Sequence, residues 1–169
     1  FESPSPIVTV PRQAFTQTGA ISIDRVLVAY PQFVAAAGAT SNEPSNDGQA
    51  NVSLRGLGTN RTLVLLDGRR LMPADGKGSV DLNILPTSLI RSVQVLTGGA
   101  STVYGSDALA GVVNLQLENA FEGMELEGSG SITDQGDGEE SAVGLTAGTS
   151  FAAKRGGIVV HLGYARRTS

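Results

Sequence analysis

The hydrophobic positions near the N-terminus form first a short continuous run and then a helical spacing. Between prolines at positions 4, 6 and 11, residues 7–10 form a short β-branched run, IVTV. Proline lacks the N–H donor that a central strand needs, so this run is predicted to be an edge strand. From position 22 the period lengthens, with apolar residues at 23, 26, 27 and 30 on one helical face. We expect an amphipathic helix with Ser22 as its N-cap and Pro31 as its stop.

The middle of the chain alternates short apolar runs with turn signals. The continuous run Leu63 to Leu66 indicates a strand buried on both faces, and Asp67-Gly68 favours a two-residue hairpin that returns through 69–72. Further elements are predicted as a short helix over 86–90, a strand at 93–96, a helical turn over 100–104 and a strand at 111–117. Two polar segments, 35–50 and 73–79, are predicted loops. This mixture predicts a compact α+β unit.

After residue 120 the pattern changes to a period of two. Three segments of about ten residues, near 121–133, 141–151 and 157–166, alternate apolar with polar or small residues. The apolar positions are Met124, Leu126, Ile132, Val143, Leu145, Phe151, Ile158, Val160, Leu162 and Tyr164. Such segments are typical of transmembrane β-barrel strands. A soluble antiparallel meander with one wet face has the same alternation, which by itself does not separate the two.

Composition removes several classes of protein. The 169 residues suffice for one domain with a core and an appendage, and only 17% of them are charged. The absence of Cys excludes a disulfide scaffold and thiolate metal sites. The net charge of -4 and the absence of a basic block argue against a nucleic-acid-binding surface. Because the sequence opens on Phe1 with no visible signal peptide, we expect it to be a piece of a longer protein.

No arrangement of residues predicts catalysis or metal binding. The glycine-rich stretch TGGAST at 97–102 lacks the lysine of a phosphate-binding loop. The acidic residues between 134 and 140 miss the spacing of a calcium loop, and the single histidine, His161, cannot form a multi-histidine site. Ser101 does not lie in a GxSxG elbow. We therefore expect no enzyme activity, no cofactor and no metal.

Three stretches carry a resemblance to a known family. They are SPSPIVTVPRQAFTQTGA (3–20), VSLRGLGTNRTLVLLDGRRL (52–71) and VDLNILPTSLIRSVQVLTGGASTVYGSDALAGVVN (80–114). In this order they resemble the plug region of TonB-dependent outer-membrane receptors. The resemblance covers about two-thirds of the sequence and implies a plug domain over 1–118. Residues 119–169 would then be the first three or so strands of an incomplete transmembrane β-barrel, a barrel of about 22 strands in the whole protein.

The resemblance also implies a function. The whole protein would be an active-transport receptor in the outer membrane of a Gram-negative bacterium, in contact with the lipid bilayer through its barrel. It would bind a small, scarce nutrient, such as an oligosaccharide or an iron chelate, and import it with energy from the TonB complex. The TonB box that receives this energy would precede Phe1. The alternative is a freestanding soluble α+β module for ligand binding or adhesion.

Two arginines are the implied contacts between plug and barrel. Arg55, at the LRG position, would pair with barrel carboxylates and seat the plug. A second seating arginine normally follows a glutamate in an ERVEV-type strand, where this chain reads Arg91, Ser92, Val93, Gln94, Val95. Arg91 would have to substitute from one residue earlier, and a one-residue shift points a strand side chain to the other face.

The two polar loops are the implied substrate-facing tips of the plug. Their candidate ligand contacts are Asn42, Asn46, Asp47 and Gln49 in the first loop and Asp75 and Lys77 in the second. These side chains offer donors and acceptors to a polar ligand. We also expect the isolated chain to associate, as a homodimer formed by strand pairing, because an open sheet edge and an apolar face both recruit a second copy.

Overall fold

The computed structural model describes residues 7–18, 22–36, 48–98, 100–119, 121–132, 139–151 and 156–167. The N-terminal domain begins with β1 (Ile7–Pro11), α1 (Arg12–Thr18), α2 (Ile23–Val28), β2 (Phe33–Ala35) and β3 (Val52–Leu54). It continues through the 3-10 helix η1 (Thr59–Arg61), β4 (Thr62–Leu66), β5 (Arg69–Arg70), η2 (Leu82–Ile84) and η3 (Thr87–Leu89). It ends with β6 (Ile90–Thr97), α3 (Ser101–Tyr104), η4 (Ser106–Ala108) and β7 (Gly111–Leu117). Three long strands follow: β8 (Gly123–Ile132), β9 (Glu139–Phe151) and β10 (Gly156–Arg167).

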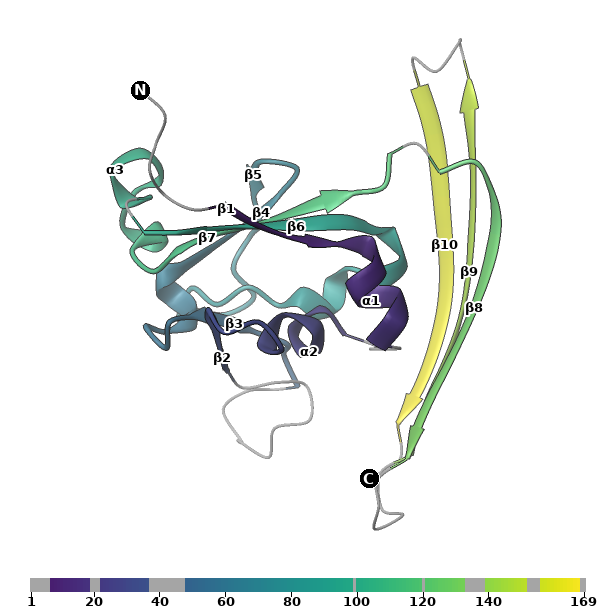
Figure 1. Ribbon diagram of the computed structural model, residues 1–169, viewed down its shortest axis with the longest axis horizontal. Helices are drawn as coiled ribbons and strands as arrows, with labels where there is room; N and C mark the ends of the chain where they lie inside the picture. Colours follow the sequence, from purple (N-terminus) through teal and green to yellow (C-terminus); the bar gives the residue numbers. More distant parts are fainter. Residues whose placement is uncertain are drawn as a thin grey trace.

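A five-stranded mixed sheet organises the N-terminal domain. Its strand order is β1-β6-β7-β4-β5, with β4 and β7 parallel and the other neighbours antiparallel. The predicted strand at 7–10 is confirmed as an edge strand, because β1 pairs with β6 alone. Helices α1 and α2 and the small sheet of β2 and β3 lie on one side of this sheet (Figure 1).

Hydrophobic packing closes both faces of the sheet. The larger core joins α1 and α2 to the sheet through Phe15, Leu27, Val64, Val93 and other buried residues. The smaller core lies on the opposite face, where Leu63, Leu65 and Val112 pack with Ala100 and Ala108 beside α3 and η4. The alternate residues of β4 therefore enter different cores. The prediction that Leu63 to Leu66 is a strand buried on both faces is confirmed.

The Asp67-Gly68 hairpin is also confirmed. Leu66 pairs with Arg69 across a two-residue turn, and both turn residues have positive φ, 47° for Asp67 and 78° for Gly68. This is the primed turn geometry that matches strand twist. Asp67 Oδ1 also accepts a hydrogen bond of 3.1 Å from the N–H of Leu117, which ties the turn to β7. The returning strand covers only 69–70, shorter than the predicted 69–72.

Other elements differ from the sequence predictions in detail. The helix expected after Ser22 is α2, and Ser22 occupies its N-cap position but makes no side-chain cap hydrogen bond. The predicted helix at 86–90 is a single 3-10 turn, η3. Helix α1 and the small β2–β3 sheet were not predicted, because their few apolar positions are too short to set a period.

Strands β8, β9 and β10 form a separate antiparallel sheet, which we call the outer sheet. Its order is β10-β9-β8, and its strands have 10, 13 and 12 residues. The outer sheet is long and curved and lies along one end of the N-terminal domain (Figure 1). The three predicted period-two segments are thus confirmed as strands. No helix within the described residues is long and apolar enough to cross a membrane.

Gly111 supplies the first testable prediction. Its φ is +142°, and an added Cβ would overlap the Leu96 carbonyl oxygen and lie 2.9 Å from Leu54 Cδ1. We expect Gly111→Ala to lower the free energy of unfolding by about 3 kcal/mol, because backbone strain and overpacking add. Urea denaturation of the chain in detergent measures this. Gly76→Ala is the matched control, since nothing lies within 4 Å of its added Cβ and we expect no measurable change.

Candidate functional site

A cleft of about 860 Å³ separates the N-terminal domain from the outer sheet. One side is formed by Phe15 of α1 and by the segment from Leu82 to Ser88, which contains η2 and the start of η3. The other side is formed by residues of β8, β9 and β10, including Glu125, Glu127 and His161. We call the boundary between the two parts, with this cleft, the seam.

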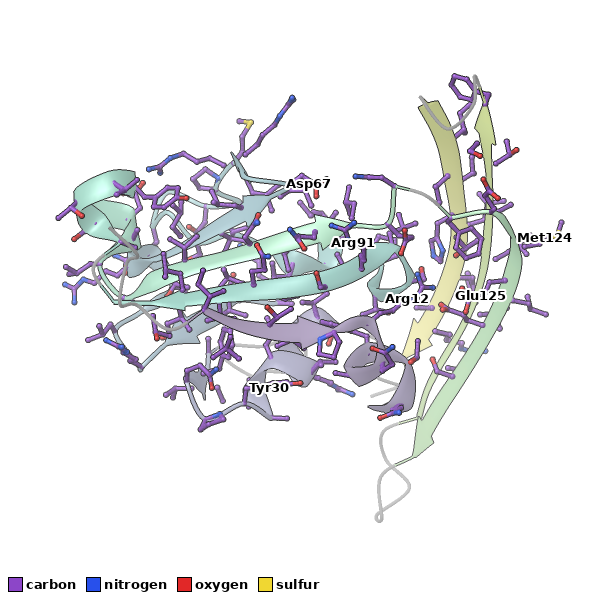
Figure 2. All side chains as sticks on the ribbon, turned by 45° about the horizontal axis from the view of Figure 1, so that its top comes forward. Arg12, Tyr30, Asp67, Arg91, Met124 and Glu125 are labelled. Atoms are coloured by element: carbon purple, nitrogen blue, oxygen red, sulfur yellow. The ribbon has the colours of Figure 1, made fainter. Side chains whose placement is uncertain are left out.

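The outer sheet presents different chemistry on its two faces. Met124 and Leu126 of β8 are each 75% exposed, and Leu162 and Tyr164 of β10 are 68% and 72% exposed. Met124 points away from the N-terminal domain in Figure 2, and the strand register places Leu126, Leu162 and Tyr164 on the same face of the sheet. The intervening Glu125 points toward the N-terminal domain in the same view. The period-two alternation thus sorts apolar side chains outward and polar ones into the seam.

Arg12 forms an ionic contact across the seam. It is the first residue of α1, and its Nη2 donates to Oε2 of Glu125 at 2.7 Å. Its Nη1 lies 3.9 Å from Oε2 of Glu118, which follows the last residue of β7. The guanidinium carbon lies 5.9 Å from the centroid of the Phe121 ring, within cation–π range. One side chain of the N-terminal domain therefore contacts both the outer sheet and the residues that connect the two parts.

His161 forms a second contact across the seam. Its Nδ1 lies 3.0 Å from Oγ of Ser88 in η3 and 2.9 Å from Oγ1 of Thr146 in β9. The ring lies against two glycines, because a Cβ on Gly144 would be 2.9 Å from Cε1 and one on Gly163 would be 2.8 Å from Nε2. The outer sheet therefore holds the imidazole flat while Nδ1 faces the N-terminal domain.

The structure places Arg55 away from the seam contacts. Arg55 is exposed, its φ is 54°, and its N–H donates to the Gln32 carbonyl at 2.9 Å. Its guanidinium lies beside Gly98, whose added Cβ would be 3.7 Å from Nη2. Within the described part of the chain, no carboxylate contacts this guanidinium. The role assigned to it by resemblance stays a prediction.

Arg91 lies at an irregularity in β6 that the sequence did not reveal. The register between β6 and β7 shifts between Ile90 and Ser92, so Arg91 is the extra residue of a bulge. Arg91 Nη2 and Ser92 Oγ both approach Oε1 of Gln116, at 3.5 and 2.7 Å. A bulge interrupts strict alternation, and the contact of Arg91 with a barrel wall stays a prediction.

The predicted loop residues divide into three groups. Asn42, Asn46 and Asp47 lie outside the described residues. Lys77 is exposed, whereas Gln49 is half-buried. Asp75 organises its own loop, because its Oδ1 accepts from the N–H groups of Ser79 at 3.0 Å and Lys77 at 2.9 Å. The Ser79 N–H, with a smaller effect of Lys77, holds the pKa of Asp75 below its usual value.

One arginine after the hairpin turn, Arg70, has a structural role. Arg70 of β5 pairs with Asp107 of η4 and donates to the carbonyl oxygen of Tyr104 at the end of α3. The Arg70 hydrogen bond, followed by that of Ser106, lowers the pKa of Asp107. These contacts fasten the segment between β6 and β7 over the smaller core.

Sequence reasoning missed the residues that make the seam. Arg12 lies in a helix that no period predicts, and a single histidine in an alternating strand does not indicate which residues it contacts. Glu125 was noticed only as a polar position in an alternating strand. The signal that was available is the alternation itself, since the polar positions of β8–β10 are the ones that meet the N-terminal domain.

Arg55→Ala supplies a second prediction. Because Arg55 is exposed and has no described carboxylate partner, we expect the free energy of unfolding of the chain to change by less than about 0.5 kcal/mol. Arg55→Gly is the companion variant, and it should stabilise the chain by about 1 kcal/mol because glycine relieves the left-handed backbone. A loss of several degrees in the melting temperature of Arg55→Ala would contradict the prediction.

Comparisons with known proteins agree with this architecture. The family model described as TonB-dependent Receptor Plug Domain matches residues 1–112. A ferric enterobactin receptor of Pseudomonas aeruginosa, PfeA, superposes with a TM-score of 0.75 at 17% identity, covering 100% of this chain and 26% of that one. The ferric citrate transporter FecA gives 0.73 at 23% identity, covering 99% and 26%. The siderophore receptor PirA of Acinetobacter baumannii gives 0.69 at 21% identity, covering 94% and 24%.

These matches establish fold and family at different levels. The chain spans about a quarter of the length of the solved receptors, and at these identities the structural likeness establishes the fold alone. The family model matches well over half of the chain. It includes β1, the hairpin of β4 and β5, and β6. The chain therefore belongs to the TonB-dependent receptor family and carries its plug domain.

Proposed function

We propose that this chain is part of an outer-membrane receptor that binds a scarce nutrient and imports it with TonB-coupled energy. In this proposal the N-terminal domain is a plug that gates a barrel begun by the outer sheet. The observation that carries the proposal is the arrangement at the seam. A domain with its own closed core lies on the polar face of an amphipathic sheet whose other face is exposed and apolar.

The dimensions and chemistry of the outer sheet support a membrane location. Strands of 10 to 13 residues suit a tilted passage through a bilayer, for which about 9–11 residues are needed. An apolar face of this extent is unusual on a soluble protein and is expected of a surface in lipid. This argues against the freestanding soluble module. Association of the isolated chain into a homodimer stays a prediction.

The remaining assignments rest on resemblance. Residues 1–118 are proposed as the plug and 119–169 as barrel, a boundary that falls between β7 and β8. Arg55 and Arg91 are proposed to meet barrel carboxylates. The first loop, with Gln49, and the second, with Lys77, are proposed to face the nutrient. Asp75 contributes by shaping the second loop.

The nutrient is proposed to be an iron chelate. The solved structures that resemble the chain are of siderophore, ferric enterobactin and ferric citrate receptors, which favours this class over oligosaccharides. An iron chelate is polar and too large for passive pores, so it fits a receptor that spends energy on import. The TonB complex is the proposed partner through a segment preceding β1.

The membrane location gives a third prediction. Leu126→Arg, on the exposed face of β8, should reduce assembly of the receptor into the outer membrane, because arginine near the bilayer midplane costs about 2–4 kcal/mol. Ser129→Arg introduces the same charge on the seam side of the same strand and should assemble better. Quantification of receptor in outer-membrane fractions measures both. Equal assembly of the two variants would contradict the assignment of faces.

The transport function gives a fourth prediction. A strain that expresses the receptor should accumulate radioactive iron from a catecholate or citrate chelate, and a strain without TonB should not. Replacement of residues 38–47 by a Gly/Ser sequence of equal length should abolish chelate binding while leaving receptor abundance unchanged. If neither chelate nor an oligosaccharide is taken up, the proposed transport is wrong. Uptake of the oligosaccharide alone would overturn the substrate class.

A further inference from the structure

We propose that Arg12 is a positioning residue that clamps the N-terminal edge strand to the linker and to the first strand of the outer sheet. The linker is the connection between β7 and β8, residues 118–122, of which the structure describes 118, 119, 121 and 122. The contacts of the clamp are independent of the proposed function, whereas its role in gating rests on that function. Without Arg12, strand β1 and the linker would move independently.

The clamp is built from three contacts, two with the linker and one with β8. Arg12 reaches Glu125 in β8 at 2.7 Å, Glu118 at the start of the linker at 3.9 Å, and the ring of Phe121 within the linker. The side chains of Arg12, Glu118 and Glu125 are 23%, 20% and 37% exposed. Partial shielding from water strengthens such a pair relative to a fully exposed one. A planar guanidinium can serve two carboxylates and an aromatic face together, which an ammonium group does less well.

Strand β1 has few other attachments. It is an edge strand with five paired positions, from Ile7 opposite Leu96 to Pro11 opposite Ser92. Pro11 has no N–H to donate, and Ile7 is 64% exposed. Val10 is the fully buried residue of the strand. Strand β1 is therefore held to the sheet along one side only, and Arg12 is the next residue along the chain.

The linker, in contrast, fits closely against the outer sheet. An added Cβ on Gly148 would be 2.5 Å from the Phe121 carbonyl oxygen, and one on Gly157 would be 3.1 Å from the Asn119 carbonyl oxygen. The linker backbone therefore approaches β9 and β10 as closely as glycine permits. A displacement of β1 would therefore be transmitted through Arg12 to a linker that is packed against the outer sheet.

The clamp has a consequence for gating. A pull on the segment before β1 would separate the edge pairs in order, beginning with Ile7 and Leu96 and ending with Pro11 and Ser92. The next contact that the chain meets is the clamp of Arg12. The clamp would therefore limit how far β1 separates from β6 before the pulling force acts on the linker and the outer sheet.

Hydrogen–deuterium exchange of the receptor in detergent, without nutrient and without TonB, tests the clamp. We expect Arg12→Gln to accelerate exchange about fivefold, both in β1 (Ile7–Val10) and in the linker amides. Glu125→Gln should reproduce most of this change, since it removes the shorter contact, and the double variant should add little. Arg69→Gln is the matched control, because it removes an exposed arginine from β5, at the opposite edge of the same sheet.

The pattern of exchange decides between clamp and general destabilisation. A clamp changes β1 and the linker together and leaves the amides of β4 and β7 unchanged. Faster exchange in β4 and β7 would overturn the proposal, as would faster exchange in only one of the two segments or an equal change in Arg69→Gln. High salt should reduce the difference between the native receptor and Arg12→Gln, because it screens the pair. Failure of the receptor to import any chelate would leave this result unaffected, so the two proposals fail separately.

Discussion

The constraint on which the rest of this structure depends is that the N-terminal domain must satisfy its own hydrophobic residues before it meets the outer sheet. A sheet with one apolar core would present its other face to the seam. Here both faces are covered, one by α1 and α2 and the other by the segment of α3 and η4. What remains at the seam is a mixed surface, in which Ile84 and Leu85 lie beside polar residues such as Ser88. The domain and the outer sheet therefore meet through a few directional contacts and a cleft rather than through a shared core.

Because the cores lie within the N-terminal domain, the free energy that folds the domain is separate from the free energy that holds it against the outer sheet. Each fully buried Leu or Val of the cores contributes about 1.5–3 kcal/mol through the hydrophobic effect. A partly exposed ion pair such as that of Arg12 and Glu125 contributes about 1 kcal/mol or less. A hydrogen bond such as that of His161 and Ser88 contributes a similar amount. The seam described here can therefore open at a cost well below that of unfolding the domain.

The sequence predicted the parts of this fold that a period or a turn residue marks. The strand at 63–66, the Asp67-Gly68 turn, β7 and the three alternating strands were found in this way, since each has a physical signal within a few residues. Helix α1 and the β2–β3 pair were missed, because seven- and three-residue elements owe their conformation to packing rather than to periodicity. The seam was missed for a related reason. Its partners Arg12 and Glu125 are 113 residues apart, and no local pattern connects them.

The glycines on the seam side of the outer sheet determine contacts that the pattern of apolar and polar side chains in the sequence does not predict. Gly144 and Gly163 face each other across β9 and β10, and together they leave room for the ring of His161. Gly148 leaves room for the Phe121 carbonyl in the same way. As sequence, these glycines only weaken the strands, because glycine has a poor β-propensity. As structure, they set how closely the linker and the imidazole approach the sheet, and hence where Nδ1 of His161 and the guanidinium of Arg12 meet their partners. Glycines on one face of a strand thus indicate where another group packs, because a backbone or a ring must occupy the space that larger side chains would fill.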